Sequence, residues 1–343
     1  MAMNFKEGRW NHEINVTDFV KTNITPYEGD ASFLVGPTER TKAVWNKCLE
    51  ALAEERANNG VRSLDPSTVS TITSFAPGYI DKENEVIVGL QTDEVLRRAI
   101  KPFGGIKVVE KACRENGVEV DPKVKDIFTH YRKTHNDGVF DAYTEEIRSF
   151  RSLGFLTGLP DNYARGRIIG DYRRLALYGL DRLIEAKQND LRHLTGPMTD
   201  ARIRLREEVA EQIKALKEIK IMGEQYGLEL GRPAHNAQEA VQWVYMAYLA
   251  AVKEQDGAAM SLGNVSSFLD IYIEYDMAHG LLDEAHAQEL IDQFVIKLRM
   301  VRHLRMQAYT DIFAGDPTWV TESIGGRFND GRTKVTKTSF RFL

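Results

Sequence analysis

The chain has 343 residues, of which 43% are hydrophobic and 28% are charged, a balance typical of a folded globular protein. The formal net charge is -5, and acidic and basic residues alternate along the whole sequence. Because a nucleic-acid-binding protein needs a concentrated basic face, the sequence argues against that class of function.

No segment has the pattern of a targeting or membrane-spanning sequence. Residues 1–16 lack the apolar core of a secretory signal, and no stretch reaches the roughly eighteen apolar residues of a membrane span. Cys48 and Cys113 are the only cysteines, and they lie far apart without metal-ligand spacing. The histidines, including His130 and His135, match no metal motif. We therefore expect a soluble, cytoplasmic protein with two buried, reduced thiols and no bound metal.

Helical patterns dominate. The first strong one begins at Thr38, a capping residue, and ends at Asn58-Asn59-Gly60. Another runs from Arg202 to Tyr226, where apolar residues recur at spacings of three and four. The inward-facing residues expected in the first helix are Trp45, Cys48, Leu49 and Leu52. Those expected in the second are Leu205, Val209, Ile213, Leu216 and Ile219.

Two more helices are expected further along the chain. Asn236 and Glu239 have the spacing of a capping box, which opens a helix through the longest apolar tract, Val241–Val252. Gln242 within that tract favours a helix buried in a core over a membrane span. Asp283 is placed to cap the next helix. Its expected inward-facing residues are Leu290, Ile291, Phe294, Val295, Leu298 and Val301.

Strand signals are fewer and shorter. The candidates are Thr71–Ser74, Phe155–Gly158, Gly257–Ser261 and Trp319–Ser323, each with turn residues close by. No internal repeat or low-complexity stretch occurs. The sequence therefore predicts a mixed α/β chain, mostly helical, in which short strands carry polar, glycine-rich motifs.

The segment Thr157–Arg174 holds the densest group of side chains that could bind a ligand. Its charged residues include Asp161, Arg165, Arg167, Asp171, Arg173 and Arg174. A guanidinium binds a carboxylate through two parallel hydrogen bonds, so an arginine on this glycine-flanked loop is a candidate carboxylate receptor. The alternative is that these arginines pair with the local aspartates and only hold the loop in place.

Two other segments have features of a pocket wall. In Phe313–Gly326, Phe313 and Trp319 could line an apolar pocket, and two adjacent glycines permit close approach of the backbone. Gly257–Gly263 consists of small residues that would let a substrate or another strand lie close. From spacing alone, core packing explains both segments at least as well.

Several motifs occur in a fixed order along the chain. They are Thr25–Leu34, Gly89–Asp93, Pro102–Ile106, Tyr131–Asn136, Arg165–Gly179, Asn236–Ala240, Gly257–Met260, Lys297–Arg302 and Gly315–Pro317. Together they resemble the pyruvate formate-lyases (formate acetyltransferases), which are glycyl radical enzymes. The resemblance extends over essentially the whole chain.

The resemblance implies an acyltransferase that converts pyruvate and coenzyme A to acetyl-coenzyme A and formate in anaerobic glucose fermentation, as a homodimer. It also implies a ten-stranded α/β barrel of two five-stranded halves with surrounding helices. Residues 1–343 would form the first half as a single incomplete domain. No tightly bound cofactor is expected, because the family uses coenzyme A as co-substrate and a protein glycyl radical installed by an iron–sulfur activating enzyme.

The resemblance also assigns candidate site residues. Arg167, the second arginine of Arg-Gly-Arg, would bind the pyruvate carboxylate. Trp319 and Phe313 would line the pocket beside the reacting carbons. Ala258 would lie against the substrate, where a larger side chain would block it. Ala164 replaces the glycine usual before the first arginine, a departure that leaves the second arginine unaffected.

The radical chemistry of the family has no counterpart in this sequence. The family stores a radical on a glycine in an Arg-Val-Ser-Gly-Tyr motif and relays it to two adjacent cysteines, one of which attacks pyruvate and carries the acetyl group. Neither feature occurs here, and the family's second carboxylate-binding arginine would lie beyond Leu343. We therefore predict the amino-terminal part of such an enzyme, without catalytic residues and inactive alone.

Other interpretations stay open. A non-catalytic or split subunit would act by associating with a separate carboxy-terminal chain, and a 2-ketobutyrate formate-lyase would differ only in pocket volume. A diol dehydratase fits less well, because those enzymes generally depart from the Arg-Gly-Arg and Gly-Asp-Pro contexts. Half a barrel should expose strand edges and apolar faces unless it associates with its other half or with itself.

Overall fold

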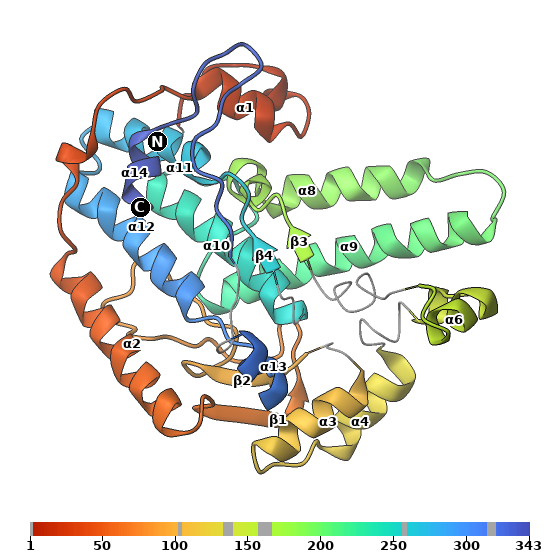
Figure 1. Ribbon diagram of the computed structural model, residues 1–343. Helices are drawn as coiled ribbons and strands as arrows, with labels where there is room; N and C mark the ends of the chain where they lie inside the picture. The colour runs from red at the N-terminus through yellow and green to blue at the C-terminus, as the bar shows by residue number, and fades with distance from the viewer. Residues whose placement is uncertain (1–2, 102–104, 133–139, 157–166, 256–258, 314–319) are drawn as a thin grey trace.

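Figure 1 shows the computed structural model of the chain, which describes residues 3–101, 105–132, 140–156, 167–255, 259–313 and 320–343. Helices account for most of these residues, and the strands are short. The long helices lie to the left and to the upper right of the view, whereas the strands lie towards its centre and lower edge (Figure 1). The mostly helical α/β class expected from the sequence is confirmed.

The long helices that build the main core are α8 (Arg173–His193), α9 (Asp200–Gln225), α10 (Ala237–Glu254), α11 (Ser266–Ala278) and α12 (Glu284–Arg299). α8 and α9 lie side by side as an antiparallel pair that projects to the right in Figure 1. α10 packs against α8, α11 and α12, so it is enclosed on several sides. Its position explains why so much of its surface is apolar.

Side chains all around α10 are buried, among them Trp243 and Tyr248. The polar exception, Gln242, accepts a hydrogen bond from the Val88 amide (2.7 Å) and donates one to the Val88 carbonyl (2.9 Å). A buried amide side chain is tolerated when its hydrogen bonds are made in this way. The buried helix predicted from the apolar tract is therefore confirmed.

The predicted helix caps are largely confirmed. Asn236 accepts from the Glu239 amide and Asp283 from the His286 amide, at 2.8 and 2.9 Å. The capping box, however, is only half formed. The Glu239 carboxylate accepts from the His235 amide (2.8 Å) and pairs with Arg232 (2.6 and 2.7 Å), instead of returning to the cap residue.

Helix α2 (Glu39–Ala57) begins after Thr38, as predicted, but part of its expected apolar stripe is wrong. Cys48 is fully buried, whereas Trp45 and Leu49 are 36% and 43% exposed. The face that packs inward is rotated relative to the predicted one, because α2 lies against α12. Its buried residues are Thr41, Val44, Cys48, Ala51, Leu52 and Glu55. The predictions that Leu205 and Val295 face inward are wrong in the same way, since both are exposed.

Shorter helices surround this core. They are η1 (Arg9–Asn11), α1 (Val16–Asn23), η2 (Ala31–Phe33), α3 (Ile106–Glu115), α4 (Pro122–Asp126), η3 (Ile127–Tyr131), α6 (Glu145–Ser152), α13 (Gln307–Phe313) and α14 (Lys337–Arg341). α1 and the amino-terminal residues pack on α11 through aromatic rings, with Phe5 and Phe19 at the centre of the group.

The described strands form two parallel pairs. β1 (Ser63–Val69) pairs with β2 (Arg97–Ile100), and β3 (Arg167–Ile169) pairs with β4 (Ala259–Ser261). Of the predicted strands, only Gly257–Ser261 matches, through its described residues. Thr71–Ser74 is a turn, Phe155–Leu156 is irregular, and Val320–Ser323 contributes a single bridge instead of a strand. Strands this short leave little periodicity in a sequence.

Helix α8 contains a sharp irregularity at Gly179, whose φ of 69° lies in the left-handed region. A Cβ at this position would lie 2.4 Å from the carbonyl carbon of Arg232 and 2.4 Å from the Gly231 oxygen. Because glycine has no side chain, the loop Leu230–Arg232 can pack directly against the backbone of α8. The Leu180 and Asp181 amides donate to the Leu230 and Gly231 carbonyls (2.9 and 3.0 Å).

Candidate substrate-binding site

The candidate site begins at the parallel pair β3–β4. Arg167, the first residue of β3, is in register with Ala259, the first residue of β4. Two segments more than ninety positions apart in the sequence, both singled out as candidate ligand-binding segments, are therefore direct neighbours. This pairing brings the second arginine of Arg-Gly-Arg to the amino end of the small-residue segment.

Residues 320–323 run parallel to the residues that directly follow β4. The Leu262 amide donates to the Thr321 carbonyl (2.9 Å), and Gly263 forms a parallel bridge with Glu322. The chain thus brings three of its motifs together in parallel, with β3 against β4 and 320–323 against the residues that follow β4. Spacing alone could not predict this, because each motif also fitted ordinary core packing.

The predicted site residues differ in how far the structure places them. Arg167 opens β3 and Phe313 ends α13, so their backbones are located. Ala258 and Trp319 lie outside the described residues. Ala259, which follows Ala258, opens β4, and Val320, which follows Trp319, directly precedes the residue that is bonded to Leu262.

A group of polar residues joins the carboxyl ends of the three segments. The Glu322 carboxylate accepts hydrogen bonds from the Val265 amide (2.9 and 3.1 Å) and the Ser266 amide (2.8 Å). The Asn264 side chain donates to the Ser323 carbonyl (2.5 Å), and Arg173 donates to the Asn264 carbonyl (3.1 Å). We call Arg173, Asn264 and Glu322 the polar brace.

Sequence reasoning named Arg173 but missed Asn264 and Glu322, the other two residues of the polar brace. Helix α11 has Val265 at its amino-terminal cap position and no capping side chain of its own, so Glu322 binds its first amides from a distant segment. A carboxylate is favoured there, because the first amides of a helix lack partners and carry partial positive charge. The local signal was Asn264, a capping residue type just before α11, but its side chain accepts from the Ser267 hydroxyl and donates to the Ser323 carbonyl instead of binding the first amides.

The two interpretations of the arginine-rich loop can now be separated for part of it. Arg173 donates to the Asp171 carboxylate (2.7 Å), and Arg174 lies 3.5 Å from the same group. These two arginines therefore hold the local chain in place, as the structural interpretation predicted. Arg165 and Asp161 lie outside the described residues.

Burial shapes the protonation of groups around the site. It raises the pKa of Glu322, although the hydrogen bonds from Ser266 and Val265 and the nearby Arg173 charge act in the opposite direction. Burial also raises the pKa of Tyr172, just before α8, to about 12. Because a buried carboxylate is costly unless hydrogen-bonded, the bonds to the α11 amides are what allow Glu322 to lie here.

The cysteines do not form a reactive pair. Cys48 lies in a small apolar cluster between α2 and α12, whereas Cys113 lies in another cluster on α3. Burial raises the pKa of Cys48 to about 12 and that of Cys113 to about 11. Because the thiolate is the reactive form, neither side chain is suited to nucleophilic chemistry in this environment.

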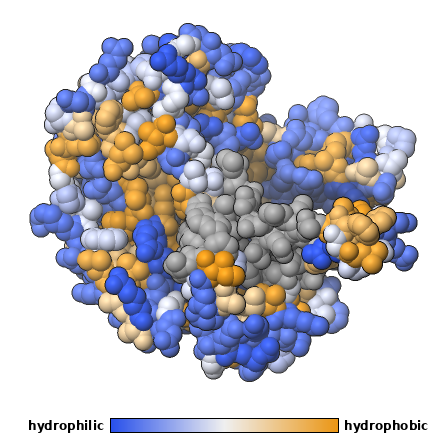
Figure 2. All heavy atoms as spheres, viewed as in Figure 1, coloured by the Kyte–Doolittle hydropathy of each residue, from blue (hydrophilic) through white to orange (hydrophobic). Residues whose placement is uncertain are grey.

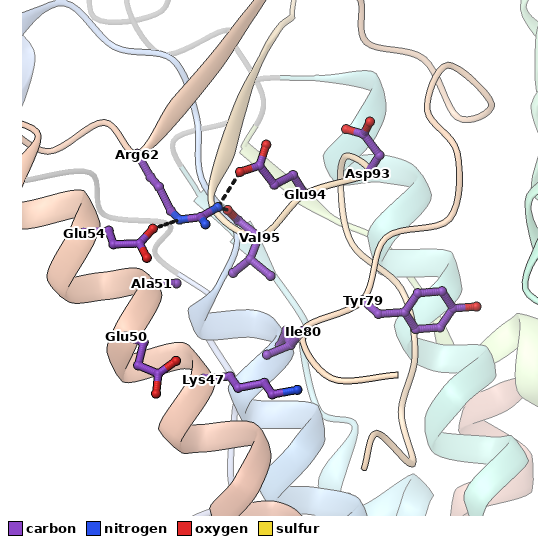
Figure 3. Close-up of a pocket in the computed structure, with 10 residues that line it drawn as sticks. All are labelled: Lys47, Glu50, Ala51, Glu54, Arg62, Tyr79, Ile80, Asp93, Glu94 and Val95. Carbon is purple, nitrogen blue, oxygen red and sulfur yellow. Dashed lines mark hydrogen bonds and ion pairs between the residues drawn. The ribbon is translucent and has the colours of Figure 1, made fainter. Parts of the chain in front are cut away.

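A surface pocket with a volume of about 280 Å³ lies elsewhere, between α2 and the loops before β1 and β2 (Figure 3). Arg62 crosses it and pairs with Glu54 (2.6 Å) and Glu94 (2.5 Å). Lys47, at its rim, pairs with Asp81 at 2.9 Å. Its cations are thus neutralised by neighbouring carboxylates, and none of the predicted site residues lines it.

Apolar side chains gather on the outer face of α6 and the residues after it, where Figure 2 shows a hydrophobic patch. Phe150, Leu153 and Phe155 are exposed there, and the two phenylalanine rings pack edge to face. An exposed apolar group of this size marks a surface that another part of a protein can cover. Among the described residues, no cluster of side chains suits a metal ion, and no helix is long and apolar enough to cross a membrane.

Comparison with known proteins identifies relatives over nearly the entire chain. Residues 7–343 match the family described as pyruvate formate lyase-like. A formate acetyltransferase from Haemophilus influenzae is 56% identical over 99% of this chain, and the match covers 45% of that relative. The chain thus spans about half the length of the curated relative it matches.

Solved structures agree on the fold. The B12-independent glycerol dehydratase of Clostridium butyricum superposes with a TM-score of 0.66 at 17% identity, covering 91% of this chain and 46% of that one. Hydroxyproline dehydratase of Clostridioides difficile gives 0.63 at 16% identity, covering 89% and 46%. A glycyl radical enzyme of Archaeoglobus fulgidus gives 0.54 at 15% identity, covering 94% and 45%. The fold is therefore about half of a glycyl radical enzyme barrel, as predicted from the sequence.

Proposed function

The chain belongs to the pyruvate formate lyase-like family, and on that premise we propose that it is the amino-terminal part of a formate acetyltransferase, which converts pyruvate and coenzyme A to acetyl-coenzyme A and formate. Its own contribution would be half of the substrate pocket. The observation that carries this proposal is the register of β3 with β4, which joins Arg167 to the small-residue segment.

The chemistry of the substrate fits that position. Pyruvate carries a planar carboxylate, and a guanidinium binds such a group through two parallel, charge-assisted hydrogen bonds. We propose Arg167 as the group that holds and orients this carboxylate. Arg173 and Arg174 do not compete for the role, because Asp171 already binds both.

The apolar end of pyruvate requires a different surface. We propose that Trp319 and Phe313 line the pocket beside the reacting carbons, and that Ala258 keeps it wide enough for the substrate. Aromatic walls would exclude water from the reacting atoms while adding apolar contact area. A 2-ketobutyrate lyase would need room for one more methylene at the same place.

We propose that the radical steps require residues supplied from outside this sequence. Its two cysteines are buried in different clusters, and burial raises the pKa of each thiol. In this proposal residues 1–343 form one incomplete domain that acts in the cytoplasm as part of a homodimer or with a separate carboxy-terminal chain. The exposed apolar face of α6 supports such an association.

An anaerobic assay tests the function directly. The chain would be incubated with pyruvate, coenzyme A and the iron–sulfur activating enzyme, alone and together with the carboxy-terminal half of the Haemophilus influenzae relative. We expect pyruvate-dependent formate only when both halves are present. Formate from the chain alone would contradict the proposed division of labour, and no formate from the mixture would count against the assignment to this reaction.

A further inference from the structure

Among the residues that the structure describes, few main-chain hydrogen bonds join 320–323 to the residues that directly follow β4. The contact consists of the Leu262–Thr321 bond and the bridge between Gly263 and Glu322, with a further bond from the Ser323 amide to the Gly263 carbonyl. A pairing this short specifies its register weakly, and a slip by one residue turns every side chain to the opposite face. An interaction other than these main-chain hydrogen bonds must therefore fix the register of this segment.

We propose that Glu322 is a positioning residue that locks the register of 320–323 against β4 and thereby sets the shape of the pocket. Its carboxylate reaches past its own segment to the first turn of α11, where it accepts three hydrogen bonds from two amides. A slip by one residue would carry the carboxylate away from both amides. The effect on substrate binding rests on the proposed function, whereas the effect on register does not.

The surroundings of Glu322 explain why a carboxylate is used. α11 leaves its first amides without a side-chain cap of its own, and these are the donors that Glu322 satisfies. The Asn264 side chain donates to the Ser323 carbonyl, and Arg173, at the start of α8, donates to the Asn264 carbonyl. The brace therefore connects the start of α8, the residues that follow β4 and segment 320–323.

A purely structural role would be different in its consequences. If Glu322 only stabilised α11, its removal would loosen the protein as a whole and leave the strand register intact. Glu289 provides a control. It is a buried glutamate whose carboxylate, like that of the half-buried Glu322, binds residues at the start of a distant helix, here Thr38 and Arg40 at the start of α2.

Hydrogen exchange read by mass spectrometry separates the two roles. In folded Glu322→Ala, we expect peptides covering 259–266 and 320–326 to exchange about 2- to 30-fold faster, the range for loss of a helix cap, while α10 peptides keep the wild-type rate. In Glu322→Gln, which retains one acceptor oxygen, the exchange rate of these peptides should lie between those of wild type and Glu322→Ala. Glu289→Ala should leave both peptides at the wild-type rate relative to α10.

The inference is overturned if Glu322→Ala changes these two peptides no more than α10, or no more than Glu289→Ala does. A pyruvate titration of the same variants, each mixed with the carboxy-terminal half of the Haemophilus influenzae relative, then tests the consequence for the pocket. We expect affinity to fall by about 2- to 30-fold in Glu322→Ala, the range for loss of a helix cap, and to recover in part in Glu322→Gln. Wild-type protein that binds no pyruvate contradicts the proposed function, and the exchange data still decide the role of Glu322.

Discussion

The parallel pairs β1–β2 and β3–β4 have the same topology but are held in place by different interactions. Beside β1–β2, the Glu55 carboxylate binds Arg302 through two hydrogen bonds (2.8 and 3.0 Å) and Arg98 through a third (3.2 Å), all buried. Beside β3–β4, Glu322 binds main-chain amides of α11 instead. At β1–β2 the carboxylate is held by two charged side chains, whereas at β3–β4 it is held by the backbone.

This difference shows how the chain uses its arginines. Arg98 and Arg302 are buried structural partners of one glutamate, and Arg173 serves the polar brace. The number of arginines in a segment therefore does not locate a substrate site. The distinguishing feature of Arg167 is its position, in register with the first residue of the small-residue strand.

The largest expected effect is on the β1–β2 side. Glu55→Ala removes the carboxylate that Arg302 contacts through two bonds, and breaking a buried ion pair from one side costs roughly 3–5 kcal/mol. We expect that loss in the free energy of unfolding measured with urea. Glu50→Ala, an exposed glutamate on the same helix, should change it by less than about 0.5 kcal/mol. Equal losses for the two variants would contradict a structural network at β1–β2.

On the β3–β4 side the same kind of change should cost less. Glu322→Ala removes hydrogen bonds to helix amides, and loss of a helix cap costs about 0.5–2 kcal/mol. The urea experiment on this variant therefore sharpens the comparison. A loss as large as that of Glu55→Ala would mean that the two pairs are held with similar strength and that the distinction drawn between them is wrong.

The smallest expected effect is on the pH dependence of stability. Burial raises the pKa of Glu322 above its ordinary value of 4.5, so folding favours the protonated acid. The stability that its protonation adds is therefore complete below pH 4.5 and is lost as the pH rises through the raised pKa, whereas the hydrogen bonds to the α11 amides remain. Glu322→Gln cannot titrate and should lack this component when urea midpoints are compared from pH 4 to pH 8. Parallel pH profiles for wild type and variant would contradict the assignment.

The sequence predicted the helical core better than the site, for physical reasons. The tract Val241–Val252 and the caps at Thr38, Asn236 and Asp283 carry local signals, so α10 and the starts of three helices were found. Which way a helix faces depends on its neighbours, so Trp45 was assigned to the interior although it is exposed on α2.

The site was predictable only in part. Resemblance to a family singled out Arg167, and the structure places its backbone beside Ala259. Glu322 escaped notice because the amides it binds belong to residues more than fifty positions away. Strands of three residues, such as β3, carry too little alternation to be recognised from sequence.

The central claim is that the amino end of β3 binds the pyruvate carboxylate through Arg167, and calorimetric titration of pyruvate tests it most directly. Replacing Arg167 by Ala should weaken pyruvate binding by about 10- to 150-fold, as expected for the loss of charge-assisted hydrogen bonds. Arg167→Lys keeps the charge but not the planar guanidinium, so its affinity should lie between those of wild type and Arg167→Ala. Arg192→Ala, at the far end of α8, should bind like wild type. Equal pyruvate affinity in wild type and Arg167→Ala would contradict the claim.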